Sequence, residues 1–171
     1  MYYSFNPYAY FFVLILTIPS SGAYGSDPHK LVGLDGNSHA LSEFVGHGYW
    51  VVVNVWSPGY PHCVDELPTL RAFHANSDIG AMVVGVAVEY PGFGYPDDAQ
   101  LSAFASENQV NFPLLLADRE LAAEFVSEYV DVVPITFAFH PDGRMVARWH
   151  GVITELDINE IINDFTVQRN E

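Results

Sequence analysis

The chain contains very little cysteine, since Cys63 is the one thiol among its 171 residues. This excludes an intramolecular disulfide, and with it any catalytic cycle in which two cysteines of one chain exchange a disulfide. The paired C-x-x-C and H-E-x-x-H spacings that mark common zinc sites are also missing. No cofactor is therefore predicted, and attention turns to the surroundings of the single thiol.

Positive charge is scarce as well. Lys and Arg number 6 against 21 Asp and Glu, which gives a formal net charge of -15. Such a field repels phosphate backbones and anionic lipid headgroups, so nucleic acid is excluded as a partner. The acidic residues are spread along the chain, which is typical of a solvated surface. Half of the residues are apolar, enough for one compact domain with a proper core.

The N-terminal segment is uncharged and contains a short apolar stretch followed by small residues that end near Ala23 or Gly25. This pattern predicts a secretory signal peptide over 1–25 and a folded domain over 26–171. The apolar stretch is short for a membrane span, which needs roughly 20 residues. The usual basic residues before it are absent, so an uncleaved anchor, with the membrane as a partner, remains an alternative. Export predicts a periplasmic or secreted location.

Apolar periodicity predicts alternating strands and helices, beginning with a short hairpin over 31–44. In the C-terminal hairpin, a turn at Asp142–Gly143 is expected to pair His140 with Met145 and Ile135 with His150. Thr154 should cap the last helix, with Asp157 in the reciprocal position. The expected strands are 49–56, 81–90, 112–118, 135–140 and 145–150, and the expected helices are 63–76, bent at Pro68, 97–109, 119–129 and 154–165.

Two motifs lie at the ends of predicted strands, "NVWSPGYPHCVDELP" over 54–68 and "VVPITFAFHPDGR" over 132–144. They resemble the "N-F-W-A-x-W-C-x-x-C-x-x-E-x-P" and "V-P-x-T-F" motifs of exported TlpA/ResA-type thiol-disulfide oxidoreductases, which belong to the thioredoxin-like superfamily. The resemblance implies an α/β fold, a three-layer α/β/α sandwich with a central mixed sheet and a short N-terminal hairpin. It also implies that the partner is an exported thiol- or disulfide-containing protein or a small thiol. The matching residues are Asn54, Trp56, Cys63, Glu66, Pro68, Val133, Pro134, Thr136, Phe137, Asp142 and Gly143.

The same resemblance implies roles for several of these residues. Pro134 is expected to be a cis-proline beside the active-site loop, with Val133 and Trp56 at the binding groove. Trp56 is better explained as a core residue. Glu66 corresponds to the carboxylate that lies close to the family's cysteines and influences their protonation, or else it is an ordinary acid in the first turn of a helix.

The redox motif itself departs from the family pattern, because Tyr60 stands where the attacking cysteine is expected. The loop therefore reads Y-P-H-C, with the Pro61–His62 pair of DsbA-like C-P-H-C oxidants but no first thiol to activate. The candidate catalytic residues are Cys63, Tyr60, His62 and Glu66. Near a helix N-terminus Cys63 gains thiolate character, whereas apolar surroundings oppose it, and the sequence leaves this balance open.

Several functions remain compatible with this loop. The first is a single-thiol or degenerate redox protein, and its main rival is a non-catalytic binding or scaffold module that uses the groove beside Pro134. A peroxiredoxin-like peroxidase that uses Cys63 is a further alternative, although Tyr60 replaces that family's Thr and no activating arginine is evident. A copper or zinc site formed by Cys63, His62 and His150 is weaker still, because scattered histidines in a chain of this size usually have no joint role.

Overall fold

The computed structural model describes residues 29–76, 80–89, 92 and 97–167. The signal peptide predicted over 1–25 lies outside these residues. Among the helices of the described segments, none is both long enough and apolar enough to cross a membrane.

The centre of the molecule is a seven-stranded mixed sheet with the strand order β2-β1-β5-β4-β3-β6-β7. Strand β4 is parallel to both β3 and β5, whereas the other neighbouring strands pair antiparallel. The short N-terminal hairpin is present and extends the sheet beyond β5. The strands are β1 (Lys30–Gly33), β2 (Ser38–Ala40), β3 (Trp50–Trp56), β4 (Ala81–Ala87), β5 (Leu114–Leu116), β6 (Ile135–Phe139) and β7 (Met145–His150).

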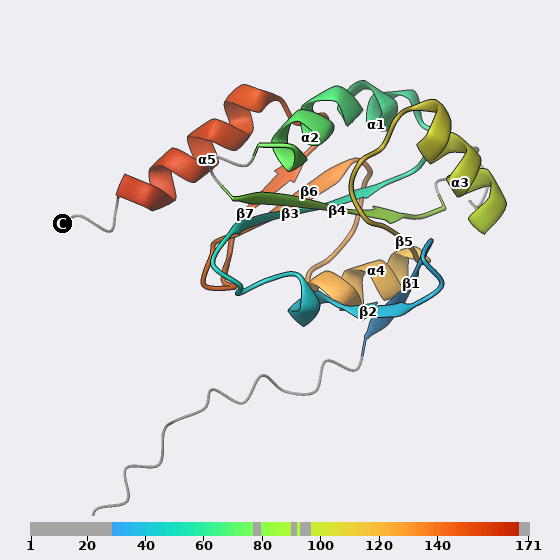
Figure 1. The fold of residues 1–171 in the computed structure, drawn as a ribbon, viewed down its shortest axis with the longest axis horizontal. Coiled ribbons are helices and arrows are strands. Elements are labelled where there is room, and N and C mark those ends of the chain that lie inside the picture. Colours follow the sequence, from blue (N-terminus) through green and yellow to red (C-terminus); the bar gives the residue numbers. More distant parts are fainter. Residues whose placement is uncertain (1–28, 77–79, 90–91, 93–96, 168–171) are drawn as a thin grey trace, which may run out of the picture.

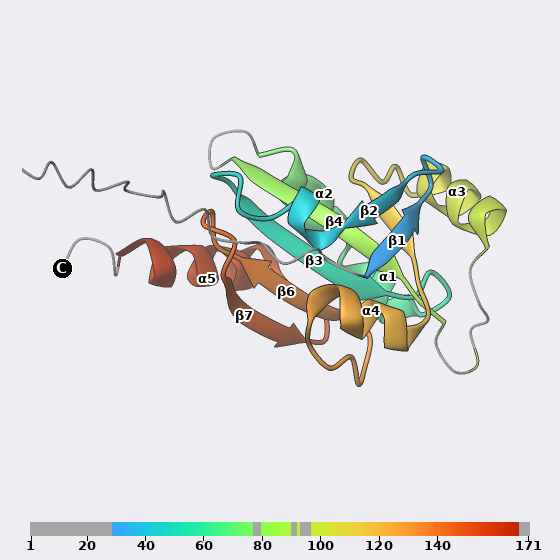
Figure 2. The ribbon, with the colours of Figure 1, turned by 90° about the horizontal axis from the view of Figure 1, so that it is seen from below.

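Helices cover both faces of this sheet. Figure 1 shows α1, α2, α3 and α5 on one face and α4 on the other, and Figure 2 shows the sheet from the α4 side. The three-layer α/β/α sandwich predicted from the sequence is thus confirmed. The helices are α1 (Pro61–Asp65), α2 (Leu67–His74), α3 (Asp98–Glu107), α4 (Arg119–Val126) and α5 (Glu155–Val167), and a short 3-10 helix, η1, spans Leu41–Glu43.

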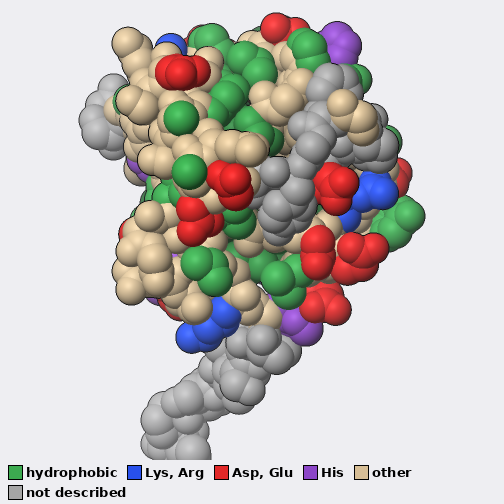
Figure 3. Space-filling view, turned by 90° about the vertical axis from the view of Figure 1, so that its right-hand side faces the viewer, with side chains coloured by type: hydrophobic (Ala, Val, Ile, Leu, Met, Phe, Trp, Pro, Cys, Tyr) green, Lys and Arg blue, Asp and Glu red, His purple; other side chains and the backbone are tan. Residues whose placement is uncertain are grey.

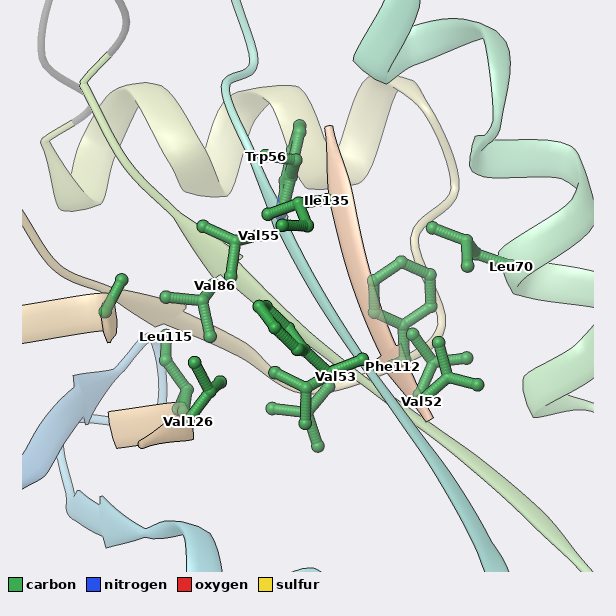
Figure 4. Packing of buried hydrophobic residues seen from close by; sticks show 14 of the residues in the cluster. Val52, Val53, Val55, Trp56, Leu70, Val86, Phe112, Leu115, Val126 and Ile135 are labelled. Carbon is green, nitrogen blue, oxygen red and sulfur yellow. The ribbon is translucent and has the colours of Figure 1, made fainter. Parts of the chain in front are cut away.

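The core is built around β3, whose seven residues are all buried. Its continuous apolar sequence is typical of a strand with both faces covered, because neither face then needs polar side chains. Figure 4 shows Val52, Val53 and Val55 among the apolar side chains that surround the central strands. The C-terminal end of this rigid strand is where the loop with Tyr60 and Cys63 begins.

The predicted helix 63–76 is divided in two, with Glu66 as the junction between α1 and α2. Pro68 occupies the first turn of α2, where its missing N–H costs no helical hydrogen bond. The helical segment is thus interrupted near Pro68 as expected, but as two separate helices rather than as one bent helix. The division places Glu66 in the interior, where it is fully buried.

The C-terminal hairpin follows its predicted register at one end only. Ile135 pairs with His150 as expected, but Met145 pairs with Phe139, so the predicted pairing of His140 with Met145 is wrong. The reason is an irregularity between Ala138 and Phe139, which shifts the register by one residue.

The predicted cap of α5 is confirmed. The Thr154 N–H donates to Asp157 Oδ2 at 2.8 Å, and the Asp157 N–H donates to Thr154 Oγ1 at 3.3 Å. These reciprocal bonds satisfy two of the backbone donors that a helix N-terminus leaves open. They fix the point at which the chain leaves β7 and enters α5.

Candidate functional site

The candidate site begins where β3 ends. After Trp56 the chain makes a turn in which the Tyr60 N–H donates to the Ser57 carbonyl at 3.1 Å. Helix α1 then starts at Pro61, whose fixed φ angle suits the first helical position. The Cys63 N–H donates to the Tyr60 carbonyl at 2.9 Å. The thiol therefore belongs to the first turn of α1, directly behind the loop.

The Cys63 thiol is sealed inside the molecule, with no exposed surface. Burial raises its pKa to about 12, although the Ser57 N–H, which donates to Sγ at 3.4 Å, acts in the opposite direction. The nearby carboxylate of Glu66 raises the pKa further. The sequence left open whether Cys63 is a thiolate or a neutral thiol. The structure favours the neutral thiol, because the effect of desolvation on the pKa outweighs that of the hydrogen bond.

Glu66 is also fully buried, and it connects parts of the chain that lie far apart. Its Oε1 accepts from Asn54 Nδ2 of β3 at 2.8 Å, and its Oε2 accepts from the Ile153 N–H at 3.0 Å. Asn54 Nδ2 also lies 3.0 Å from Thr136 Oγ1 of β6. Burial raises the pKa of Glu66 to about 7 against the opposing effect of these hydrogen bonds. Glu66 is therefore an interior titrating group near Cys63, and an ordinary exposed first-turn acid is excluded.

Tyr60 and His62 lie on the outer side of the loop. The Tyr60 ring is half-buried, and it meets the His62 ring edge-on with 5.2 Å between the ring centroids. The His62 side chain is 64% exposed, and its Nδ1 lies 3.6 Å from Asp65 Oδ2. The two aromatic rings therefore form the surface of the loop, while the sulfur lies beneath it.

Pro134 lies beside the same loop, at the start of β6. The pairing of Val55 with Ile135 places it next to the last residue of β3, and the peptide bond that joins it to Val133 is cis. The Gly151 N–H donates to the Pro134 carbonyl at 2.9 Å, so the end of β7 approaches from the other side. Both Val133 and Pro134 are buried.

Trp56 is not part of an accessible groove. Its side chain is 1% exposed and packs against Phe104 of α3, with ring centroids 5.2 Å apart. Its indole N–H and the Ser57 hydroxyl are buried without a hydrogen-bond partner among the described residues. Trp56 is therefore a core residue, as its position in a continuous apolar strand favoured.

The metal alternative gains no support from the geometry. The part of the chain that the structure describes holds no group of three or more His, Cys, Asp or Glu side chains that could bind a metal ion. His150 lies near Pro134 as expected, but its exposed ring faces Asp131, with 3.8 Å between Nδ1 and Oδ1. Cys63 is buried while His62 and His150 are exposed, so the three do not form one site.

An exposed apolar surface near Pro134 is a feature that the sequence did not indicate. Tyr129 is 71% exposed, Val132 38% and Val152 36%. Arg148 of β7 donates to the Tyr129 carbonyl at 2.9 Å, which holds this segment against the edge of the sheet. We call Tyr129, Val132 and Val152 the apolar rim. No local periodicity in the sequence marks these three residues.

The fold, the thiol at the start of α1 and the proline beside it define a thioredoxin-like protein of a redox lineage. A family model described as AhpC/TSA family matches residues 28–148, and the chain therefore belongs to this family. No match was found among curated proteins.

Solved structures of thiol-disulfide oxidoreductases share the fold. A thioredoxin family thiol:disulfide interchange protein from Chlorobium tepidum is 19% identical, with a TM-score of 0.64 over 78% of this chain and 90% of that one. A DsbF homologue from Corynebacterium diphtheriae is 23% identical, with a TM-score of 0.64 over 79% and 82%. A secreted thiol-disulfide isomerase from Corynebacterium glutamicum is 21% identical, with a TM-score of 0.65 over 77% and 79%.

Proposed function

We propose that this chain is an extracytoplasmic, degenerate member of the thiol-disulfide oxidoreductase lineage that no longer turns over disulfides. The observation that carries the proposal is the state of Cys63, which is fully buried and has a pKa raised to about 12. Disulfide exchange begins with attack by an accessible thiolate. At pH 7 a thiol whose pKa is raised this far is almost entirely protonated.

The replacement of the attacking cysteine by Tyr60 also argues against disulfide turnover. A phenol cannot form the mixed disulfide that starts the exchange cycle. Were Cys63 to form such a bond after an opening of the loop, the chain would hold no second thiol to resolve it. A single-thiol role is thus restricted to slow, intermolecular capture of a thiol or disulfide.

The apolar rim supports a binding role for the surface that remains. Tyr129, Val132 and Val152 expose large apolar side chains. Val132 lies two residues before Pro134, and Val152 follows Gly151, whose N–H donates to the Pro134 carbonyl. Exposed apolar clusters bordered by polar residues are common at protein interaction sites. A non-catalytic module that holds an exported thiol- or disulfide-containing protein at this rim is therefore the second candidate function, and it needs no reactive sulfur.

A peroxidase that uses Cys63 has less support. Peroxide attack also requires a thiolate, usually stabilised by a positive group. The charged group that influences the Cys63 pKa is the carboxylate of Glu66, and it raises that pKa. Peroxide consumption by the wild-type protein that disappears in Cys63→Ser would favour the peroxidase and contradict our proposal.

Thiol titration tests the proposal directly. An aromatic disulfide reagent should react with Cys63 at least about 100-fold more slowly in the native protein at pH 7 than in urea, because burial and protonation both withhold the thiolate. Cys63→Ser gives the background. Rapid labelling of the native protein, or catalytic reduction of insulin disulfides by the wild type, would overturn the proposal.

The extracytoplasmic location rests on the uncharged apolar segment over 1–25. N-terminal sequencing of the natively expressed protein tests it. We expect the mature chain to start soon after Ala23 or Gly25, in an extracytoplasmic fraction. A mature chain that keeps Met1 in the cytoplasm would contradict the predicted export.

A further inference from the structure

A cavity of about 370 Å³ lies between the β1–β2 hairpin, the C-terminal end of α3 and the start of β5. Its volume lies within the range of small-molecule sites, about 300–1,000 Å³. Most of its walls are apolar and include two aromatic rings. The apolar side chains that matter here are Leu34, Phe44, Val110, Phe112, Leu114 and Leu115.

This cavity is separate from the thiol site. It borders β1 and β5, whereas Pro134 precedes β6, and the strands β4 and β3 stand between β5 and β6 in the sheet. Neither Cys63 nor the apolar rim lines it. A ligand in the cavity would therefore leave the surface around Pro134 free.

One end of the cavity is polar and carries negative charge. Asp35 and His39 line it, and His39 Nε2 lies 3.0 Å from Asp35 Oδ2. The other ring nitrogen, Nδ1, lies 3.1 Å from Glu43 Oε2. Hydrogen bonds from Asn37 are the main cause that lowers the pKa of Asp35 to about 2. Two carboxylates thus flank one imidazole, so these three side chains sum to a net negative charge whether or not His39 is protonated, with Lys30 near Glu43 as the opposing charge.

The hairpin is shaped to hold this pair in place. A Cβ on Gly33 would lie 2.6 Å from Asp35 Oδ1 and 3.1 Å from His39 Cδ2, so the glycine makes room for both side chains. The Asn37 N–H donates to Asp35 Oδ1 at 3.0 Å, which fixes the carboxylate within the turn. The negative end of the cavity is therefore preorganised, and a ligand has little side-chain ordering to bring about.

We propose that this cavity binds a small molecule with an apolar body and a single cationic group, such as an aryl-alkyl ammonium ion. The apolar body lies against Phe44 and Phe112, and the cation faces Asp35. Charge complementarity carries the choice, because an anion would meet the Asp35 carboxylate and a chain of net charge -15. Figure 3 shows acidic side chains across the face of the molecule that carries α3 and the hairpin.

Three matched probes test this choice in titrations of the ¹⁵N-labelled protein, namely 2-phenylethylamine, 2-phenylethanol and 3-phenylpropanoate. We expect saturable amide shifts centred on Leu34, Val110 and Leu115, with affinity falling from the amine to the alcohol to the acid. Asp35→Asn should weaken the amine about three- to fivefold and leave the alcohol unchanged, because solvent screens an ion pair at this half-exposed carboxylate. The absence of saturable shifts with the amine, or equal affinities for amine and acid, would overturn the proposal.

A second variant keeps the test informative if Asp35→Asn disturbs the hairpin. Val110→Trp fills the cavity from the end of α3. It should lower the affinity for the amine, measured from the amide shifts, by at least about tenfold. Val132→Trp, on the apolar rim, is the matched control and should leave them unchanged. Both variants should keep the dispersed amide spectrum of the folded chain. Wild-type affinity in folded Val110→Trp would contradict the proposal.

Discussion

Glu66 is a carboxylate held in the interior with a pKa of about 7, well above the ordinary value of 4.5. The folded protein therefore binds the Glu66 proton more tightly than the unfolded chain does. This contribution to stability is complete below pH 4.5 and is lost as the pH rises through 7, a loss of about 3 kcal/mol. Glu66→Gln removes the titration, so the free energy of unfolding should fall less steeply between pH 5 and 8 than in the wild type.

Urea denaturation at several pH values measures this slope. The slope is the readout rather than the absolute stability, because a glutamine amide cannot accept from both Asn54 and the Ile153 N–H. Glu107→Gln changes an exposed helical carboxylate and is the matched control. Equal slopes in Glu66→Gln and the wild type would show that Glu66 does not titrate in this range.

Tyr60 is the second residue whose replacement has a defined outcome. Tyr60→Cys restores C-P-H-C, with an outer thiol on the loop and Cys63 one helical turn inward to resolve a mixed disulfide. We expect insulin disulfide reduction to rise at least about tenfold above the wild-type background. The double variant Tyr60→Cys, Cys63→Ser should lose this turnover. A folded Tyr60→Cys protein with wild-type activity would mean that the loop lacks more than the missing sulfur.

At the scale of elements, the cap of α5 is a local feature with a predictable contribution. Thr154→Ala removes the hydroxyl that accepts from the Asp157 N–H and should lower the free energy of unfolding by about 1 kcal/mol. Thr166→Ala, near the other end of α5, is the matched control and should change it by less than about 0.5 kcal/mol. Urea denaturation at pH 7 compares the two. Equal losses would contradict the assigned cap.

The elements also show how far the sequence could predict this fold. The continuous apolar run of β3 and the capping pair of α5 are local patterns, and both predictions hold. The shifted register at Phe139 was not predicted, because it depends on how β6 pairs with β7. Pro68 predicted a bend in the helix, whereas the structure divides the helix two residues earlier, at Glu66. At this junction the Glu66 carboxylate accepts from the Ile153 N–H, a contact between residues far apart in the sequence.

In the candidate site, too, the sequence predicted some features and missed others. The motifs located the loop and Pro134, since strand ends and prolines leave local signatures. The depth of the Cys63 sulfur is set by packing from several segments, and the motifs carry no information about it. The apolar rim was not predicted either, because Val152 is brought near Pro134 by a long-range hydrogen bond from Gly151, at the end of β7.

At the scale of the whole molecule, the net charge of -15 opposes compaction. Like charges repel one another at low ionic strength, and salt screens them, with a Debye length of about 10 Å at 0.1 M. We expect Tm to rise by about 3 °C or more between 10 mM and 500 mM sodium chloride, corresponding to about 1 kcal/mol. Calorimetry measures Tm, and tetramethylammonium chloride should raise Tm similarly if screening of the like charges is the cause. A Tm that falls as salt is added would contradict this explanation.

The sealed sulfur also affects how the intact chain behaves among oxidants. A solitary thiol on a surface is readily crosslinked to a second copy or capped by glutathione, and outside the cytoplasm, the location that we propose, no cytosolic reductant reverses this. Cys63 lies beyond the reach of such reagents while the fold is closed. The protein should therefore migrate as a monomer on a non-reducing gel after storage in air, and only unfolding would open the way to covalent dimers.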